Sequence, residues 1–389
     1  VYKLEVMGDI YMQKVRKSNF ELMRIISMVM IIYYHIIIHG NILINSANIY
    51  FTFVNEVVEF LIIVHVNLFM LLTGYFQVDS KFKLSKVFSL FAQTIFYAIG
   101  IMVLLSSLGL VSINKIVVMR EVFLLENTGQ YWFIKVYLLL YCLSPFINIL
   151  INKLDRNTYK KLIFSSIFLI CAIPYFTGNK GFFVNNGFSL YNAIVMYLIG
   201  AYFKQYQLKD SYHFTNMSKR KYQTILLFPY FFFAFINYAL YKTSAQLVLN
   251  SPIFNEIFGN FITCAFQYEN PIIIVQSICL FLFFESLDIK YNKYINRIAK
   301  LIFGVYLIHE NFLLQPLLYK MLKIDNGMIY SFRFIIYVIF IVIVIFTTGI
   351  FVEFLRQKIF KFIYNRKISH KFRDCVKTYL YDFGFRINW

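Results

Sequence analysis

Apolar stretches of about 20 residues recur along this chain, and they limit what it can fold into. A segment that crosses the hydrocarbon core of a bilayer has to satisfy its own backbone hydrogen bonds, so such stretches form helices. Ten stretches have the necessary length, and they run from Phe20 to Gly40, Glu56 to Phe76, Val87 to Leu110, Trp132 to Ile151, Leu162 to Gly178, Gly187 to Phe203, Tyr222 to Tyr241, Pro271 to Leu287, Ala299 to Tyr319 and Ile329 to Leu355. We therefore predict an all-α polytopic membrane protein with about ten transmembrane helices.

The connections between these stretches alternate between rich and poor in lysine and arginine. The chain has 38 Lys and Arg against 19 Asp and Glu, and most of the basic residues lie in the N-terminal segment, alternate connections and the C-terminal tail. The other connections hold only Lys115, Arg120, Lys180, Lys242, Lys320 and Lys323. By the positive-inside rule the basic set is cytoplasmic, which predicts that both termini are cytoplasmic.

This pattern also predicts location, partners and domain organisation. The basic residues are explained by topology and by attraction to anionic membrane lipid, so nucleic acid is not an expected partner. We expect a multi-pass protein of the plasma (cytoplasmic) membrane. A ten-helix membrane domain is predicted over residues 1–355, followed by a basic cytoplasmic tail over residues 356–389.

Two ionisable side chains share the first apolar stretch. Arg24 lies near its cytoplasmic start and His35 lies past the midplane. Eleven residues at about 100° each place both side chains on one helix face, about 16 Å apart along the axis. Because ionisable groups are costly in a membrane unless they face a bundle interior or a wet cavity, the pair indicates a polar path. Structural roles remain open for each: a hydrogen bond to a neighbouring helix for His35, and snorkelling to the headgroups for Arg24.

His39 follows His35 by one helical turn, a spacing that can bind a metal ion. A metal site would need a further ligand, and the sequence positions no carboxylate or thiolate beside this pair. The five cysteines show no CxxC spacing. We therefore predict no metal and no bound cofactor.

The second apolar stretch carries a further set of polar residues. Glu56 and Glu59 lie at its predicted outer mouth, and His65 and Asn67 lie at mid-depth. Glu56 and Asn67 are also eleven residues apart, so on a continuous helix they would share a face and form a second wall of the same cavity. Capping of the helix N-terminus by the two glutamates is the alternative interpretation.

The ninth apolar stretch brings His309 and Glu310 to mid-depth. Adjacent helical residues point about 100° apart, so these two need not pair with each other, and Glu310 is a candidate to orient His35 instead. Tyr306 lies one turn earlier, where it either lines an acceptor site or only packs.

Two basic residues lie near predicted outer helix ends, Lys135 in the fourth stretch and Arg333 in the tenth. They are candidates to bind an anionic glycan or a lipid pyrophosphate. Snorkelling of these long side chains to the headgroups is the alternative.

Four blocks of sequence resemble a known family. Arg24 and His35 fit an R-x10-H pattern, and the other three blocks are Asn67 to Phe76 (NLFMLLTGYF), Trp132 to Pro145 (WFIKVYLLLYCLSP) and Phe303 to Glu310 (FGVYLIHE). In this order, on a ten-span topology, they resemble the acyltransferase 3 family of membrane acyltransferases that modify sugars. The chain departs from the family at Lys83-x-x-Lys86, where many members have R-x-x-R, and lysine lacks the planar fork with which arginine binds phosphate.

The resemblance implies transfer of an acyl group, usually acetyl, from cytoplasmic acetyl-CoA to a hydroxyl of an extracellular or lipid-linked glycan, such as a cell-envelope exopolysaccharide. Acyl-CoA would be a co-substrate. Arg24, Lys83 and Lys86 would bind its phosphates at the inner entrance, and His35 would act as general base or as an acylated nucleophile. Trp132 would belong to the acceptor side of the cavity.

Two other functions compete with this one. A transporter that flips a glycan or lipid-linked sugar would also place ionisable residues along a central path, and a membrane polysaccharide polymerase would need a wide outer cavity. Transporters tend to show repeats with broken helices, and polymerases usually have long outer loops. The sequence shows neither, because the longest predicted outer loop covers only residues 242–270.

Overall fold

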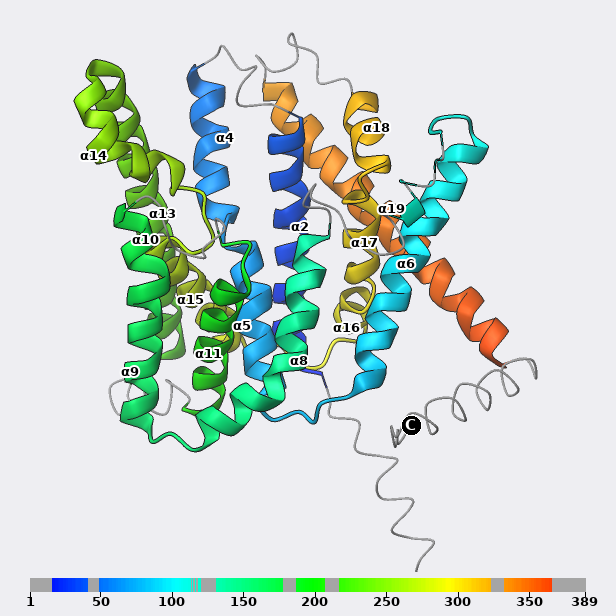
Figure 1. The fold of residues 1–389 in the computed structure, drawn as a ribbon, viewed down its shortest axis with the longest axis horizontal. Helices are drawn as coiled ribbons and strands as arrows, with labels where there is room; N and C mark the ends of the chain where they lie inside the picture. Colours follow the sequence, from blue (N-terminus) through cyan, green and yellow to red (C-terminus); the bar gives the residue numbers. More distant parts are fainter. Residues whose placement is uncertain are drawn as a thin grey trace, which may run out of the picture.

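The computed structural model describes residues 16–40, 49–112, 131–177, 187–206, 217–322 and 332–365, with isolated positions between 114 and 119. Every regular element within these ranges is a helix (Figure 1). The helices are α2 (Ser18–His39), α4 (Ile49–Ile62), α5 (His65–Gln77), α6 (Leu84–Ser107), α8 (Trp132–Asn152), α9 (Arg156–Ile167), the π-helix η1 (Phe168–Ala172), α10 (Ile173–Thr177), α11 (Leu190–Gln205), α13 (Lys219–Asn250), α14 (Pro252–Thr263), α15 (Pro271–Ser286), α16 (Lys293–Ala299), α17 (Ile302–His309), α18 (Leu314–Met321) and α19 (Phe332–Asn365). The basic tail from residue 366 onward lies outside the described residues.

Seven apolar helices among the described residues are long enough to cross a membrane, or eight if a bent pair forms one span. This makes the chain a multi-pass membrane protein, although the sequence predicted ten spans. Three segments account for the difference. α11 and α15 have 16 residues each, which is only about 24 Å of helix against a hydrocarbon core of about 30 Å. The ninth predicted span bends by 87° between α17 and α18.

The helix α2 lies in the middle of the bundle, with α4, α13 and α14 to one side and α6, α17 and α19 to the other (Figure 1). It contacts α5, α15, α16, α17 and α19. This central position follows from its sequence, because apolar residues cover most of its surface and let it pack on several sides. The side chains that α2 carries are therefore the ones most able to meet residues from other helices.

The described residues that flank the connections predicted to be cytoplasmic lie together at one end of the bundle, the lower end in Figure 1. Four contacts join them: Lys204 Nζ to Asp79 Oδ2 at 3.4 Å, Lys219 Nζ to Asp288 Oδ2 at 3.6 Å, Gln205 Nε2 to Asn152 Oδ1 at 2.6 Å, and the backbone N–H of Asn292 to Ser18 Oγ at 2.8 Å. The start of α2 therefore shares this end with the C-terminal ends of α5, α8, α11 and α15.

The short inner helices α5 and α11 pack with their backbones in close contact. Gly74 of α5 faces the carbonyl of Tyr197, and Gly200 of α11 faces the carbonyl of Leu71. A Cβ atom at either glycine would overlap the opposite backbone. Small residues allow this close approach in membrane bundles, where van der Waals packing between helices replaces the hydrophobic effect.

Gly74→Ala should therefore destabilise the bundle by about 1–3 kcal/mol, the usual cost of overpacking. The measurement is the midpoint of thermal unfolding of the purified protein in detergent. The matched control is Gly100→Ala in α6, where an added Cβ would have no atom within 4 Å. That variant should unfold no earlier than the wild type, because alanine is the better helix former. Equal midpoints for both variants would contradict the close packing of α5 on α11.

Candidate active site

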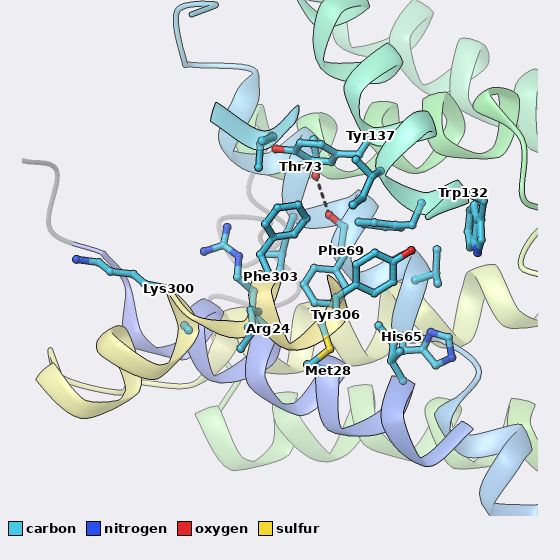
Figure 2. A pocket seen from close by; sticks show the side chains of 18 of the residues that line it. Arg24, Met28, His65, Phe69, Thr73, Trp132, Tyr137, Lys300, Phe303 and Tyr306 are labelled. Atoms are coloured by element: carbon cyan, nitrogen blue, oxygen red, sulfur yellow. Dashed lines mark hydrogen bonds between the residues drawn. The ribbon is translucent and has the colours of Figure 1, made fainter. Parts of the chain in front are cut away.

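A cavity of about 350 Å³ lies between α2, α5, α8 and α17. Its lining changes in character from one end to the other (Figure 2). Cations line one end, apolar and aromatic side chains line the middle, and imidazole and aromatic rings line the other end. The cations are Arg16, Arg24 and Lys300, the middle includes Met28, Phe69, Phe303 and Tyr306, and the far end includes His35, His65, Trp132 and Tyr268. Figure 2 shows Lys300 and Arg24 on the side opposite to His65 and Trp132.

The basic end is organised by one buried carboxylate. Glu21 Oε1 accepts a hydrogen bond from Arg24 Nη1 at 2.5 Å, and Glu21 Oε2 lies 3.5 Å from Arg16 Nη1. The Arg24 guanidinium also lies over the ring of Phe76, 5.4 Å from its centroid. Three cations against one carboxylate leave this end positively charged, and its guanidinium groups are held in place for an anionic ligand.

The two lysines predicted to stand beside Arg24 do not line this cavity. Lys86 Nζ lies 4.4 Å from the ring centroid of Tyr141 on α8, and the backbone N–H of Lys83 donates to the Tyr141 hydroxyl at 3.0 Å. Both lie at the start of α6, where they contact Tyr141 of α8. Arg16 and Lys300 occupy the positions at the cavity instead, and nothing in the sequence separated them from the many other basic residues of the cytoplasmic connections.

His35 meets two side chains from the end of α17. Its Nδ1 atom lies 2.9 Å from Glu310 Oε1 and 3.2 Å from His309 Nε2. His309 is buried, and its own Nδ1 lies 2.7 Å from the carbonyl oxygen of Val305. The predicted contact between Glu310 and His35 is therefore present, and His309 joins it.

These contacts assign the proton positions. A carbonyl oxygen can only accept, so His309 Nδ1 carries a proton and a neutral His309 presents a lone pair at Nε2. The neighbours of His35 Nδ1 are then two acceptors, His309 Nε2 and the Glu310 carboxylate. His35 Nδ1 therefore carries the proton, and the lone pair of a neutral His35 is on Nε2. A carboxylate in this place holds the imidazole in one tautomer and stabilises the imidazolium that forms when Nε2 takes a proton.

The break after α17 explains how adjacent residues reach the same imidazole. α17 ends at His309, and Glu310 is its C-cap residue with φ −95° and ψ 6°. The side chain of Asn311 then accepts the backbone N–H groups of Leu313 and Leu314 at 3.1 and 3.2 Å, which stabilises the bend into α18. The separation of about 100° expected on a continuous helix does not apply here.

A second break changes the predicted wall on the second span. Residues 63–64 interrupt the helix between α4 and α5, so the spacing of eleven residues no longer fixes a common face for Glu56 and Asn67, and neither lines the cavity. Glu56 pairs with Lys242 Nζ at 2.9 Å. Asn67 donates to the carbonyl of Tyr268 at 2.8 Å, and its side-chain oxygen accepts from Asn192 Nδ2 at 3.3 Å. These two residues therefore contact α13, α11 and the connection before α15, and they do not line this cavity.

His65 does line the cavity, as the first residue of α5 after the break. Its ring lies between those of Tyr34 and Tyr268, with centroid distances of 5.1 and 5.6 Å. Both ring nitrogens are buried and have no hydrogen-bond partner among the described residues. Tyr268 was not singled out from the sequence, because its connection before α15 carries no distinctive motif.

The remaining predicted residues divide into three groups. Trp132 and Tyr306 line the cavity. Lys135 lies in the first turn of α8 but is not among the lining residues. Arg333 is in the first turn of α19, and its side chain lies outside the described residues.

The prediction that no metal binds assumed that no carboxylate reaches the pair His35 and His39. Glu310 Oε1 lies 2.9 Å from His35 Nδ1 and 3.8 Å from His39 Nε2. That assumption is wrong, because the bend after α17 turns Glu310 towards α2.

The apolar helices and the partly buried ionisable groups around one cavity define a multi-pass membrane protein with an enzyme-like site. A family model described as an acyltransferase domain matches residues 17–353, which includes His35, Lys300 and Glu310. The chain belongs to this acyltransferase 3 family and is a membrane acyltransferase. No curated protein and no solved structure gave a significant match.

Family membership also decides between the functional classes. Broken helices are common in transporters, and the bend between α17 and α18 is one that the sequence did not indicate. The bend removes one sequence-based reason against a transporter. The match to the acyltransferase family over most of the chain places the protein among the enzymes instead.

Proposed function

We propose that this protein moves an acyl group, acetyl in the simplest case, from cytoplasmic acyl-CoA to a hydroxyl of an extracellular or lipid-linked glycan. The observation that carries the proposal is the polarity of the cavity, with Arg16, Arg24 and Lys300 at one end and His35 at the other. Acyl-CoA has the same order of groups: phosphates, a long neutral arm and a thioester. The proposed orientation has the basic end facing the cytoplasm, in agreement with the positive-inside rule.

The donor would bind with its phosphates between the cations. Guanidinium groups form bidentate hydrogen bonds with phosphate oxygens, and Glu21 already holds Arg24 in place for such a contact. The apolar middle of the cavity, with Phe69 and Phe303, suits the neutral arm. The thioester would then lie near His35, because Arg24 and His35 are separated along α2 by about 16 Å.

In the chemical step, His35 Nε2 removes the proton of the sugar hydroxyl while that oxygen attacks the thioester carbonyl. The C–S bond breaks, the acyl group stays on the sugar oxygen, and the CoA thiolate receives the proton back from the imidazolium. Glu310 stabilises the imidazolium between these two transfers. A route through acyl-histidine uses the same Nε2 atom as the nucleophile, so both routes need the same tautomer.

The acceptor would enter at the end lined by Trp132, Tyr268 and His65. The rings of Trp132 and Tyr268 are stacked, with centroids 5.9 Å apart and planes 23° apart. Rigid aromatic faces with a few polar groups nearby are typical of small-molecule sites, and they suit the apolar faces of a sugar ring. His65 offers two unpartnered ring nitrogens for hydroxyl groups of the acceptor.

The proposal is tested with purified protein in lipid vesicles, given acetyl-CoA labelled in the acetyl group and a glycan acceptor on the opposite side. We expect label on the glycan that mild alkali releases, as for an ester, and none with empty vesicles. Glycan that crosses the membrane without label would contradict the proposal and support a flippase. The ester that disappears from the surface polysaccharide of a deletion strain would then identify the acyl group and the acceptor.

Lys300→Gln should weaken donor binding. Loss of one hydrogen bond to a charged group costs about 1.5–3 kcal/mol, so KM for acyl-CoA should rise about tenfold or more while kcat changes little. The control is Lys293→Gln, at the other end of α16 and outside the cavity. Steady-state kinetics at saturating acceptor measure both variants. An equal rise in KM for both would show that Lys300 acts only through general charge, and would remove it from the donor site.

A further inference from the structure

A second arrangement of ligand-type side chains lies at the far end of α2 from the cations. His35 and His39 are one helical turn apart, and Glu310 reaches them from the bend between α17 and α18. One ligand atom from each of the three lies within 4.8 Å of the other two. Two imidazoles and a carboxylate whose ligand atoms face one another are a typical ligand set for a transition-metal ion.

The distances fit a zinc ion. Tetrahedral zinc with bonds of about 2.0–2.1 Å places its ligand atoms about 3.3 Å apart. Glu310 Oε1 lies 2.9 Å from His35 Nδ1 and 3.8 Å from His39 Nε2, so these distances lie on either side of that value. Mg²⁺ and Ca²⁺ prefer oxygen ligands and are poorly served by two imidazoles. The His39 side chain is 34% exposed, which gives an ion a way in.

We propose that Zn²⁺ binds to His35 Nδ1, His39 Nε2 and Glu310 Oε1, and that its binding inhibits the enzyme. Inhibition follows from the tautomer of His35 that metal binding imposes. Without metal, His35 Nδ1 carries the proton and Nε2 has the lone pair. A metal ion takes the lone pair of Nδ1, so the proton of neutral His35 moves to Nε2. His35 then has no lone pair for the sugar hydroxyl or for the acyl group.

This consequence rests on the proposed role of His35, whereas the binding itself does not. Binding is therefore measured first, on the purified full-length protein after removal of metals by a chelator. Calorimetry with Zn²⁺ should show one site per chain, and Co²⁺ should give the visible absorption of a tetrahedral ion. His39→Ala and Glu310→Gln should each weaken Zn²⁺ binding about 100-fold or more. Loss of a residue that only supports a ligand already costs about 10–100-fold in metal affinity, and these two residues are direct ligands.

The control for binding is His65→Ala, which removes a buried histidine outside the cluster and should leave Zn²⁺ affinity unchanged. In the same calorimetric titration, Mg²⁺ at the same concentration should give no heat of binding. Failure of the wild type to bind Zn²⁺, or equal affinity in wild type and His39→Ala, would overturn the metal site. Neither result depends on whether the protein transfers acyl groups.

Activity is measured second, with the vesicle assay. Zn²⁺ should inhibit the wild type, and a chelator should restore transfer. His39→Ala should transfer acyl groups at the wild-type rate without metal and should resist the same Zn²⁺ concentration. Activation by Zn²⁺ would overturn inhibition and indicate a catalytic ion. Absence of transfer in the metal-free wild type, with Zn²⁺ binding intact, would count against the proposed function and leave the binding site standing.

Discussion

Acyl transfer should fall by about 10²–10⁴-fold in His35→Ala, the usual contribution of a general base. The physical reason is the geometry around Nδ1, where Glu310 and His309 leave Nε2 as the basic nitrogen. Alanine removes that nitrogen and also any route through acyl-histidine. The measurement is the rate at which labelled acetyl appears on the glycan, normalised to the amount of protein in the membrane.

The matched control is His39→Ala, one helical turn further along α2, with the same change in side-chain volume. It should keep the wild-type rate, since His39 does not line the cavity. If His35→Ala fails to accumulate, His35→Gln keeps a polar side chain of similar length and still lacks a base. Transfer at the wild-type rate by either His35 variant would show that His35 is not the catalytic base.

Glu310→Gln should reduce kcat by about 10²-fold or more, because an amide in this place supports the wrong histidine tautomer. The glutamine side chain can donate an N–H group to His35 Nδ1, which moves the imidazole proton to Nε2. The donor contacts lie at the other end of the cavity, so KM for acyl-CoA should stay near its wild-type value. Steady-state kinetics in both substrates separate these effects.

Glu310→Asp is the conservative control, since it keeps the charge and shortens the side chain by one methylene. We expect it to retain more activity than Glu310→Gln. A rise in KM with an unchanged kcat in Glu310→Gln would instead mean that the carboxylate acts in substrate binding. Equal losses in the two variants, together with a lower midpoint of thermal unfolding, would mean that Glu310 only holds the bend after α17.

Much of the fold follows from local patterns. Apolar length predicted a helix in each of the ten stretches, and every one of these regions contains helix. Among the described residues, seven or eight of the ten predicted spans pass as membrane-crossing helices, because hydropathy does not show whether a helix is long enough or straight. α11 and α15 are short inner helices, and the stretch from Ala299 to Tyr319 is bent by 87°.

The candidate site was predictable in part. Arg24 and His35 lie on one regular helix, so their common face could be computed from residue spacing, and both line the cavity. The same spacing did not bring Glu56 and Asn67 to the cavity: residues 63–64 interrupt the helix between them, and both side chains contact other segments. Periodicity is a reliable guide only where the helix is continuous.

Helical segments, the alternation of basic connections and the pair Arg24 and His35 could be predicted from the sequence, because each depends on the composition or spacing of stretches of about 20 residues. The assembly of the site depends on contacts between distant segments. Lys300 and Arg16 stand at the cavity because α16 packs beside the start of α2. Glu310 reaches both His35 and His39 because the chain bends after α17. Such convergence is set by helix breaks and packing, and neither leaves a regular spacing in the sequence.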